Sequence, residues 1–401
     1  MTKKFLGLNG YQWVWVLWIA VAVFTWQLKY FKHIDNNYLI FRQSYYHARA
    51  QTSLYAWYPK EYGDLYFYGP LFTIFVAPFA IPPHAIGFLL WCVGNALALL
   101  WAVDLLPFSD RKKMLILLFC AIEYANSVFY MQFNPMITAM ILLGFIFVEK
   151  EKEEWSTMFT VLGALMKLYP VVGLTFFLFS KHKGKFALWT VIWSVVFFFL
   201  PMLISSPQFV IQCYHEWFPA LSFKNGLNVD LHSSQDICLM GVVRRLTSNT
   251  TIPNSPFLAA GALLFALPLL RFSQYKEYNF RLQVLASALI AVVIFSTGAE
   301  HPTFIIAVTG AVIYIMMQPE PFTRINIIFL VLLLVVTGLC LTDACPQPIR
   351  NDIMFRYSVK AWPCIIIWFK IVYELLFKDF TKKTPRPDAG DVPALYVISD
   401  C

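Results

Sequence analysis

The chain has 401 residues, of which 59% are hydrophobic and only 13% are charged, and its mean hydropathy is +0.61. An average soluble domain carries about 25% charged residues, so this composition excludes a water-soluble globular protein. The net charge of +8 does not indicate nucleic acid as a partner, because the lysines and arginines form short clusters between apolar segments, where they act as topology signals.

Apolar windows recur along the whole chain, and many approach the ~20 residues that a membrane-spanning helix needs. We therefore expect an all-α, polytopic membrane protein with about 10–13 helices in one domain over residues 1–377. The first window, 12–30, lacks a small-residue cleavage site and predicts a retained helix. Residues 378–401, with Lys382 and Pro385, predict a flexible cytoplasmic tail.

Clusters of basic residues predict the topology, because positive residues stay on the cytoplasmic side. Lys3 and Lys4 precede the first helix, and further clusters follow the windows 85–107 and 155–180. Both termini are therefore expected in the cytoplasm of a cell with this protein in its inner (plasma) membrane. The segments 31–69, 206–254, 299–302 and 343–355 are expected outside.

Two apolar segments are unsuited to a simple crossing. Segment 70–82 is too short for a hydrocarbon layer of ~30 Å at ~1.5 Å per residue, so we expect it to enter from outside and return. Segment 155–180 is long but is interrupted by Lys167 and Pro170, which predicts two half-helices with a break inside the membrane. Irregular backbone at that depth is tolerated where it lines a cavity.

The long external segments carry most of the polar and aromatic residues outside the membrane. Stretches 38–52 and 207–222 predict amphipathic helices in the interface, and an aromatic face over a cavity suits a lipid-linked substrate. A disulfide between the external Cys213 and Cys238 is one alternative, and free thiols are the other. The cysteines in apolar windows are expected to behave as small hydrophobes: Cys92, Cys120, Cys340 and Cys364.

The order of residues over 37–82 resembles glycosyltransferase family 87, whose members are polyprenyl-phosphate-sugar-dependent enzymes of the C-type glycosyltransferase fold. The positions that carry this resemblance are Asn37, Tyr38, Phe41, Ala48, Tyr55, Tyr66, Tyr68, Pro70, Pro78 and Pro82. Farther along, Gln132 and Asn134 resemble the Gln-x-Asn pair of the family, and Lys167 with Pro170 resembles its Lys-x-x-Pro motif. Beyond these motifs the second half of the chain matches only in its hydrophobic rhythm.

Three positions depart from the family pattern. Asn37 stands where the family has an acidic residue taken as the catalytic base, and an amide cannot accept a proton from a hydroxyl at neutral pH. Gly69 stands where a second proline is common, and Met131 where a glycine often precedes the glutamine. Either the base has moved along the chain or the activity differs.

The resemblance implies transfer of a mannose-like hexose from a polyprenyl-phosphate donor to an extracytoplasmic glycolipid or glycan, with inversion at the anomeric carbon. C-type folds are in general not bound to a metal, so neither a metal nor a cofactor is expected. Such chemistry requires a carboxylate to deprotonate the acceptor and cations to hold the phosphate. Asp64 and Asp35 are the candidate bases beside Asn37, and a solvated loop carboxylate is the alternative for each.

Lys167 is the first candidate phosphate ligand, because an ammonium inside an apolar window normally faces a partner or a pathway; snorkelling to an interface is the alternative. Gln132 and Asn134 are candidates for hydrogen bonds to sugar hydroxyls or for helix capping, and Tyr68 is assigned with them to the substrate. The remaining substrate candidates are Glu300 and His301 for the sugar and Arg244 and Arg245 as further phosphate contacts.

Other polar residues have structural explanations. Glu123 in an apolar window either serves the site or pairs with a neighbouring helix. Asp230, His232 and Asp236 lie close together, but their spacing matches no structural metal site.

Two rival functions remain open, a transporter that moves its substrate without bond cleavage and a non-catalytic glycolipid-binding protein. The transporter is disfavoured because the interruptions near 82 and 170 have no counterpart after 255.

Overall fold

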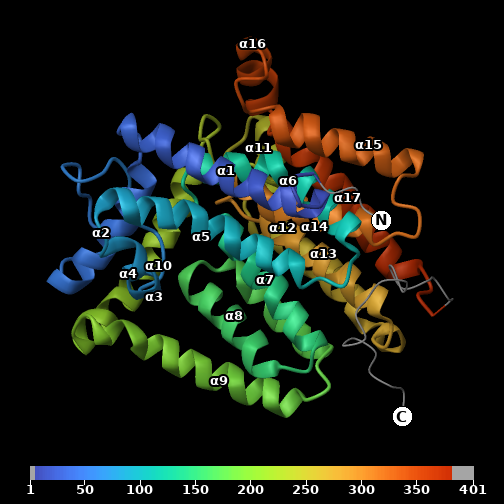
Figure 1. Cartoon of the computed structure of the whole chain (residues 1–401), viewed down its shortest axis with the longest axis horizontal. Coiled ribbons are helices and arrows are strands. Elements are labelled where there is room, and N and C mark those ends of the chain that lie inside the picture. The colour runs from blue at the N-terminus through green and yellow to red at the C-terminus, as the bar shows by residue number, and fades with distance from the viewer. Residues whose placement is uncertain (1–4, 382–401) are drawn as a thin grey trace.

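The computed structural model describes residues 5–381, and this part of the chain is all-helical, with 73% helix and no strand (Figure 1). Lys3 and Lys4, used above to predict the topology, and the expected tail from Lys382 onward lie outside the described residues. The fold class predicted from composition is therefore confirmed.

The helices differ widely in length. In chain order the α-helices are α1 (Gly10–Phe31), α2 (Asn36–Ala50), α3 (Leu71–Phe75), α4 (Ala77–Ala80), α5 (His84–Asp104), α6 (Asp110–Phe129), α7 (Asn134–Glu149), α8 (Glu153–Met166), α9 (Lys183–Phe199), α10 (Pro207–Asn228), α11 (Leu239–Thr247), α12 (Ser255–Ala266), α13 (Tyr278–Ile294), α14 (Phe304–Met316), α15 (Arg324–Leu332), α16 (Gln347–Ile349) and α17 (Trp362–Phe377). Short 3-10 or π segments complete them: η1 (Tyr169–Leu178), η2 (Leu200–Leu203), η3 (Leu267–Leu270), η4 (Phe272–Gln274), η5 (His301–Thr303), η6 (Leu333–Leu339), η7 (Arg350–Phe355) and η8 (Val359–Ala361).

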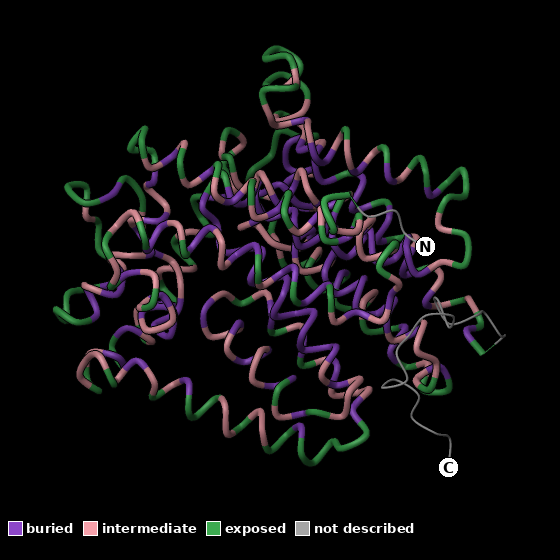
Figure 2. The backbone as a smooth tube through the Cα atoms, viewed as in Figure 1, coloured by how far each residue is buried: buried purple, intermediate pink, exposed green. Residues whose placement is uncertain are grey.

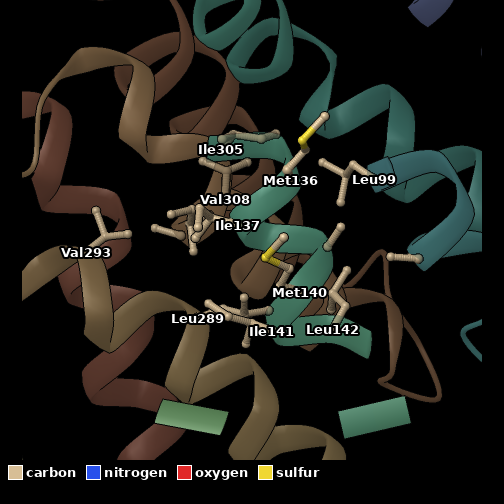
Figure 3. Close-up of a cluster of buried hydrophobic side chains, with 14 of the residues drawn as sticks. Leu99, Met136, Ile137, Met140, Ile141, Leu142, Leu289, Val293, Ile305 and Val308 are labelled. Atoms are coloured by element: carbon tan, nitrogen blue, oxygen red, sulfur yellow. The ribbon is translucent and has the colours of Figure 1, made fainter. Parts of the chain in front are cut away.

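The core is built around α7, α13 and α14, most of whose residues are buried. Every residue of α14 from Phe304 to Met316 is buried, as expected for a helix surrounded by other helices. Gly310 lets α13 and α14 approach closely, because a Cβ there would lie 2.7 Å from the Ala286 carbonyl oxygen. Figure 3 shows side chains of α7 packed between those of α13 and α14, among them Met136, Ile137, Ile141, Leu289, Val293, Ile305 and Val308.

The outer helices expose apolar side chains, as a membrane protein requires. Within residues 5–381, three segments are long and apolar enough to span a membrane: Gly10–Phe31, His84–Asp104 and Lys183–Leu203. In the last of these, only 17% of the apolar window is buried, and Figure 2 shows exposed and half-buried residues along α9. Since water would not tolerate such a surface, α9 is suited to contact lipid.

The expected short segment 70–82 folds as two brief helices, α3 and α4, which confirms that its helices are too short to cross a bilayer. The Tyr38 hydroxyl donates to the Phe79 carbonyl at 2.7 Å. Gly87 on α5 lies against the same carbonyl, because a Cβ there would be 2.0 Å from that oxygen. This contact holds α4 against α5 and fixes the loop 81–83 between the two helices.

The predicted interruption of segment 155–180 is also confirmed. Helix α8 ends at Met166, Lys167 adopts an extended conformation (φ −147°, ψ 121°), and η1 begins at Tyr169 and packs back along α8. Pro170 lies in the first turn of η1 and has no backbone N–H, so it cannot continue the hydrogen bonds of α8. Gly163 accommodates the reversal, since a Cβ there would lie 2.6 Å from the Pro170 ring. Lys167 therefore stands at the apex of a helical hairpin.

Both predicted amphipathic helices are present as α2 and α10, although α10 continues through Asn228, beyond the predicted end at 222. The disulfide alternative is wrong, because Cys213 and Cys238 are both free and buried. Cys238 instead donates to Asp236 Oδ1 at 3.1 Å. The four cysteines in apolar windows are buried as expected.

Candidate functional site

Lys167 is held at the hairpin apex by a single side-chain hydrogen bond. Its Nζ donates to Asn134 Oδ1 at 2.8 Å, and Asn134 Nδ2 donates in turn to the Pro302 carbonyl at 3.0 Å. The same Nζ lies 5.6 Å from the ring centroid of Tyr68 and 5.2 Å from that of Tyr169. Because rings attract cations and the amide accepts one hydrogen, the ammonium is oriented without being neutralised.

A chain of amide and carboxylate contacts runs beside the lysine. The Tyr68 hydroxyl donates to Gln132 Oε1 at 3.2 Å, and Gln132 Nε2 donates to Glu300 Oε1 at 3.1 Å. Gln235 Nε2 donates to the other Glu300 oxygen at 2.9 Å. We call the cluster of these residues the Lys167 site: Lys167, Asn134, Tyr68, Gln132, Glu300 and Gln235. It joins five segments that are distant in sequence.

The segment with Tyr68 is fixed by its backbone against α8 and α10. The Gly69 amide donates to the Met166 carbonyl at 3.0 Å, and Trp217 Nε1 donates to the Phe67 carbonyl at 3.0 Å. A Cβ at Gly69 would lie 2.0 Å from the Leu165 carbonyl oxygen. The glycine that departs from the family pattern therefore has a local reason, because a proline could neither donate this hydrogen bond nor fit.

The segments that carry Gln235 and Glu300 are joined by two backbone hydrogen bonds. The Asp236 amide donates to the Thr297 carbonyl, and the Ile237 amide donates to the Ala299 carbonyl, both at 2.9 Å. This short pairing aligns the loop before α11 with the turn before η5. As a result, the side chains of Gln235 and Glu300 lie within hydrogen-bonding distance of each other.

Arg244 and Arg245, predicted as phosphate contacts, are buried, and their guanidinium groups donate hydrogen bonds to other groups of the protein. Arg245 donates to the carbonyls of Ser233, Gln235 and Asp236, at 2.8 to 2.9 Å. Arg244 pairs with the Asp236 carboxylate at 2.7 Å. Burial raises the pKa of the Asp236 carboxyl, and hydrogen bonds from Cys238 and Arg244 oppose that rise. Both arginines thus shape the loop that presents Gln235, and the structure does not bring them into the Lys167 site.

Asp35 and Asn37, predicted for catalysis, also have protein partners. Asp35 is buried and lies 2.5 Å from His84 Nε2. Asn37 Nδ2 donates to the Tyr130 carbonyl at 2.8 Å, so the amide nitrogen satisfies an acceptor that a carboxylate would repel. Within residues 5–381, neither side chain forms a hydrogen bond to a residue of the Lys167 site.

Asp64 differs from these two residues because it is exposed. Its Oδ1 accepts the Leu65 amide at 2.7 Å, and its other oxygen has no partner among the described residues. The preceding Gly63 amide donates to Asn36 Oδ1 at 2.6 Å, which ties this loop to the start of α2. Asp64 also begins the short run that ends at Tyr68, so an exposed carboxylate stands four residues before the Lys167 site in the chain.

His301 and Glu123 lie behind the Lys167 site. His301 is buried with its ring edge on to Tyr130, at a centroid distance of 5.8 Å. Glu123 on α6 pairs with Lys360 at 2.5 Å, and both side chains are almost fully buried. The pairing alternative predicted for Glu123 is therefore confirmed, and this carboxylate belongs to the core.

Sequence reasoning missed four residues that the structure gathers around Lys167. Gln235 holds Glu300, and the Tyr169 hydroxyl lies 3.1 Å from Ser296 Oγ. Lys224 on α10 places its Nζ 4.5 Å from the ring centroid of Phe67. Lys224 had a recoverable signal, since continuing the amphipathic period of α10 beyond 222 puts it seven residues after Trp217, on the same face.

The acidic and histidine residues of the loop before α11 do not converge. Asp230 and His232 are exposed, whereas Asp236 is buried against Arg244. Within residues 5–381, no group of three or more His, Cys, Asp or Glu side chains is arranged to hold a metal ion.

Comparison with known proteins gives one family. The model of glycosyltransferase family 87 matches residues 66–297, a range that begins two residues before Tyr68 and includes Gln132, Asn134, Lys167 and Gln235. Neither the curated proteins nor the solved structures gave a match.

Proposed function

The chain belongs to glycosyltransferase family 87, whose model covers more than half of it, and we propose from this a specific reaction for this membrane glycosyltransferase. It transfers a mannose-like hexose from a polyprenyl-phosphate donor to an extracytoplasmic glycolipid or glycan acceptor. The proposed topology is multi-pass, with both termini in the cytoplasm and the Lys167 site facing outward.

The observation that carries the proposal is the convergence of Lys167, Tyr68, Gln132 and Glu300. An oriented ammonium that forms no ion pair within residues 5–381 suits the donor phosphate, and the amide and carboxylate oxygens beside it suit sugar hydroxyls. Aromatic rings next to these groups provide an apolar platform for a sugar ring or for isoprenoid.

In the proposed mechanism, Asp64 is the general base. It takes the proton of the acceptor hydroxyl while the acceptor oxygen attacks the anomeric carbon from the face opposite the phosphate, which inverts that centre. The bond between the anomeric carbon and the phosphate oxygen breaks, and its electron pair stays on the phosphate beside Lys167. Asp64 is favoured over Asp35 because Asp35 is buried against His84.

The test is transfer from labelled polyprenyl-phosphate hexoses to acceptor lipids in proteoliposomes. Lys167→Ala and Asp64→Asn are each expected to lower kcat by about 10²- to 10⁴-fold, as loss of a phosphate contact or of a general base does. Lys276→Ala, which changes an exposed lysine, is the matched control.

Two outcomes would contradict the proposal. Absence of transfer by the wild-type protein with every donor, combined with movement of intact labelled lipid across the membrane, indicates a transporter. Undiminished transfer by both variants shows that the chemistry lies at another site.

A further inference from the structure

Lys224 is brought close to Lys167 by the segment between them. Trp217 and Lys224 lie on the same face of α10, and Trp217 Nε1 donates to the Phe67 carbonyl at 3.0 Å. The Lys224 Nζ lies 4.5 Å from the Phe67 ring centroid. The next residue, Tyr68, has its ring 5.6 Å from the Lys167 Nζ. The two ammonium groups therefore flank two consecutive aromatic residues.

Neither of these ammonium groups has an ion-pair partner among the described residues, whereas three of the buried or half-buried cations elsewhere do. Arg244 is paired with Asp236, Arg281 with Glu149, and Lys360 with Glu123. The carboxylate nearest in the site, Glu300, is held by two glutamine amides.

Two cations that share a site repel each other. Lys224 repels Lys167, whereas the Glu300 carboxylate attracts it. Such an arrangement is unfavourable in the empty protein and becomes favourable when an anion lies between the two groups. Its natural occupant is a phosphate with more than one negative charge.

We propose that Lys224 is a second phosphate ligand, which matches the charge that appears on the phosphate as the sugar leaves. This inference rests on the proposed function. The bound donor is a phosphodiester with one negative charge. When the bond to the anomeric carbon breaks, the electron pair stays on the oxygen and the product is a phosphomonoester with up to two charges.

Lys167 and Lys224 therefore have different roles. Lys167, oriented by Asn134, serves the monoanionic donor, and Lys224 adds an interaction that strengthens only as the second charge develops. Interactions that are stronger in the transition state than in the ground state raise kcat. Loss of Lys224 is thus expected to lower kcat far more than it raises the KM for the donor.

The direct test measures binding of two short lipids, farnesyl phosphate and its methyl ester, to the purified full-length protein in nanodiscs. At pH 8 the first carries two charges and the second carries one, since the second pKa of a phosphomonoester is about 6. The wild-type protein is expected to bind the dianion at least tenfold more tightly than the ester, and to lose most of this preference at pH 5.

Three variants make the test specific. Lys224→Met is expected to abolish the preference for the dianion while it still binds the ester, which also reports that the protein is folded. Lys224→Arg is expected to keep the preference because it keeps the charge. Lys276→Met removes an exposed lysine elsewhere and is expected to behave as wild type.

The proposal is overturned if Lys224→Met retains the wild-type ratio of the two affinities, or if its loss of transfer is mainly a rise in KM. Competition by millimolar inorganic phosphate as strong as that by farnesyl phosphate would also overturn it, by showing a site for free phosphate. Absence of transfer by the wild-type protein refutes the proposed function instead, and the binding ratio judges Lys224 separately.

Discussion

At position 37 the chain carries an amide in place of the family carboxylate, and the structure gives that amide a partner. Asn37 Nδ2 donates to the Tyr130 carbonyl, so an aspartate there would place two acceptors against each other. We expect Asn37→Asp to leave kcat unchanged or lower it, and to destabilise the protein by about 1–3 kcal/mol.

Steady-state transfer and thermal unfolding of the Asn37→Asp variant check this expectation. Asn37→Ala, which loses the hydrogen bond without adding charge, is the control. A tenfold rise in kcat for the aspartate variant would mean that position 37 remains the place of the base, and Asp64 would lose its assigned role.

The buried pair of Glu123 and Lys360 gives a second prediction. Removal of one partner leaves the other charge buried and unpaired, so Lys360→Met is expected to cost about 3–5 kcal/mol of stability. Arg350→Gln breaks a pair with the fully exposed Asp343 and is expected to cost less than about 1 kcal/mol.

Thermal unfolding of both variants in nanodiscs compares the two pairs directly. If Lys360→Met unfolds at the same temperature as Arg350→Gln, the Glu123 carboxylate is not left as an uncompensated charge and the pair does not stabilise the core. The double variant with Glu123→Gln is expected to recover part of the loss, because it no longer leaves a lone carboxylate.

At the level of elements, the hairpin of α8 and η1 depends on glycine at its closest approach. A Cβ at Gly163 would lie 2.6 Å from the Pro170 ring, whereas a Cβ at Gly184 on α9 meets nothing within 4 Å. Gly163→Ala is therefore expected to destabilise the protein by about 1–3 kcal/mol and to lower transfer, since it displaces Lys167. Gly184→Ala is expected to be neutral or to stabilise α9 by up to about 1 kcal/mol.

Unfolding temperatures and kcat of the two glycine variants are the measurements. Equal behaviour of the two proteins would show that the apex adjusts without loss and that its geometry does not set the position of the ammonium.

The sequence was sufficient to predict those helices whose ends are marked by local residues such as proline. The break at Lys167 follows from a proline and a charge within four residues, and the short helices over 70–82 follow from their length alone. The end of α10 was missed because the residues after 222 include Asn225 and Gly226, which are weak helix formers, although α10 continues through them to Asn228.

The site was predictable only where a motif marked it. Lys167, Gln132, Asn134 and Glu300 were selected from sequence and are gathered together by the structure. The role of Arg245 as a clamp on the loop of Gln235 was not predictable, because it depends on carbonyl groups whose direction the fold alone decides. Hydrogen bonds between segments 65 or more residues apart leave no local pattern.

For the molecule as a whole, the proposed topology predicts which thiol reacts from outside the cell. Among the described cysteines, only Cys345 is partly exposed and the others are buried. In intact cells, a membrane-impermeant maleimide is expected to label Cys345, and Cys345→Ser is expected to remove this signal. A cysteine introduced at Lys276 in the Cys345→Ser background is expected to react only after permeabilisation.

Labelling of the introduced cysteine at 276 in intact cells, without labelling of Cys345 in the native chain, would reverse the orientation. The Lys167 site would then face the cytoplasm, where the acceptor would have to be a different molecule.

The ion pair between Glu123 on α6 and Lys360 on η8, just before α17, also constrains the order in which the protein can be assembled. Glu123 emerges from the ribosome more than two hundred residues before Lys360. A lone carboxylate is costly in lipid, so α6 cannot settle among acyl chains while synthesis continues. The nascent bundle must keep this carboxylate protonated, hydrated or shielded until the final helix arrives. A chain that stops short of position 360 is therefore expected to leave the Glu123 carboxylate unpaired and to be less stable than the full chain.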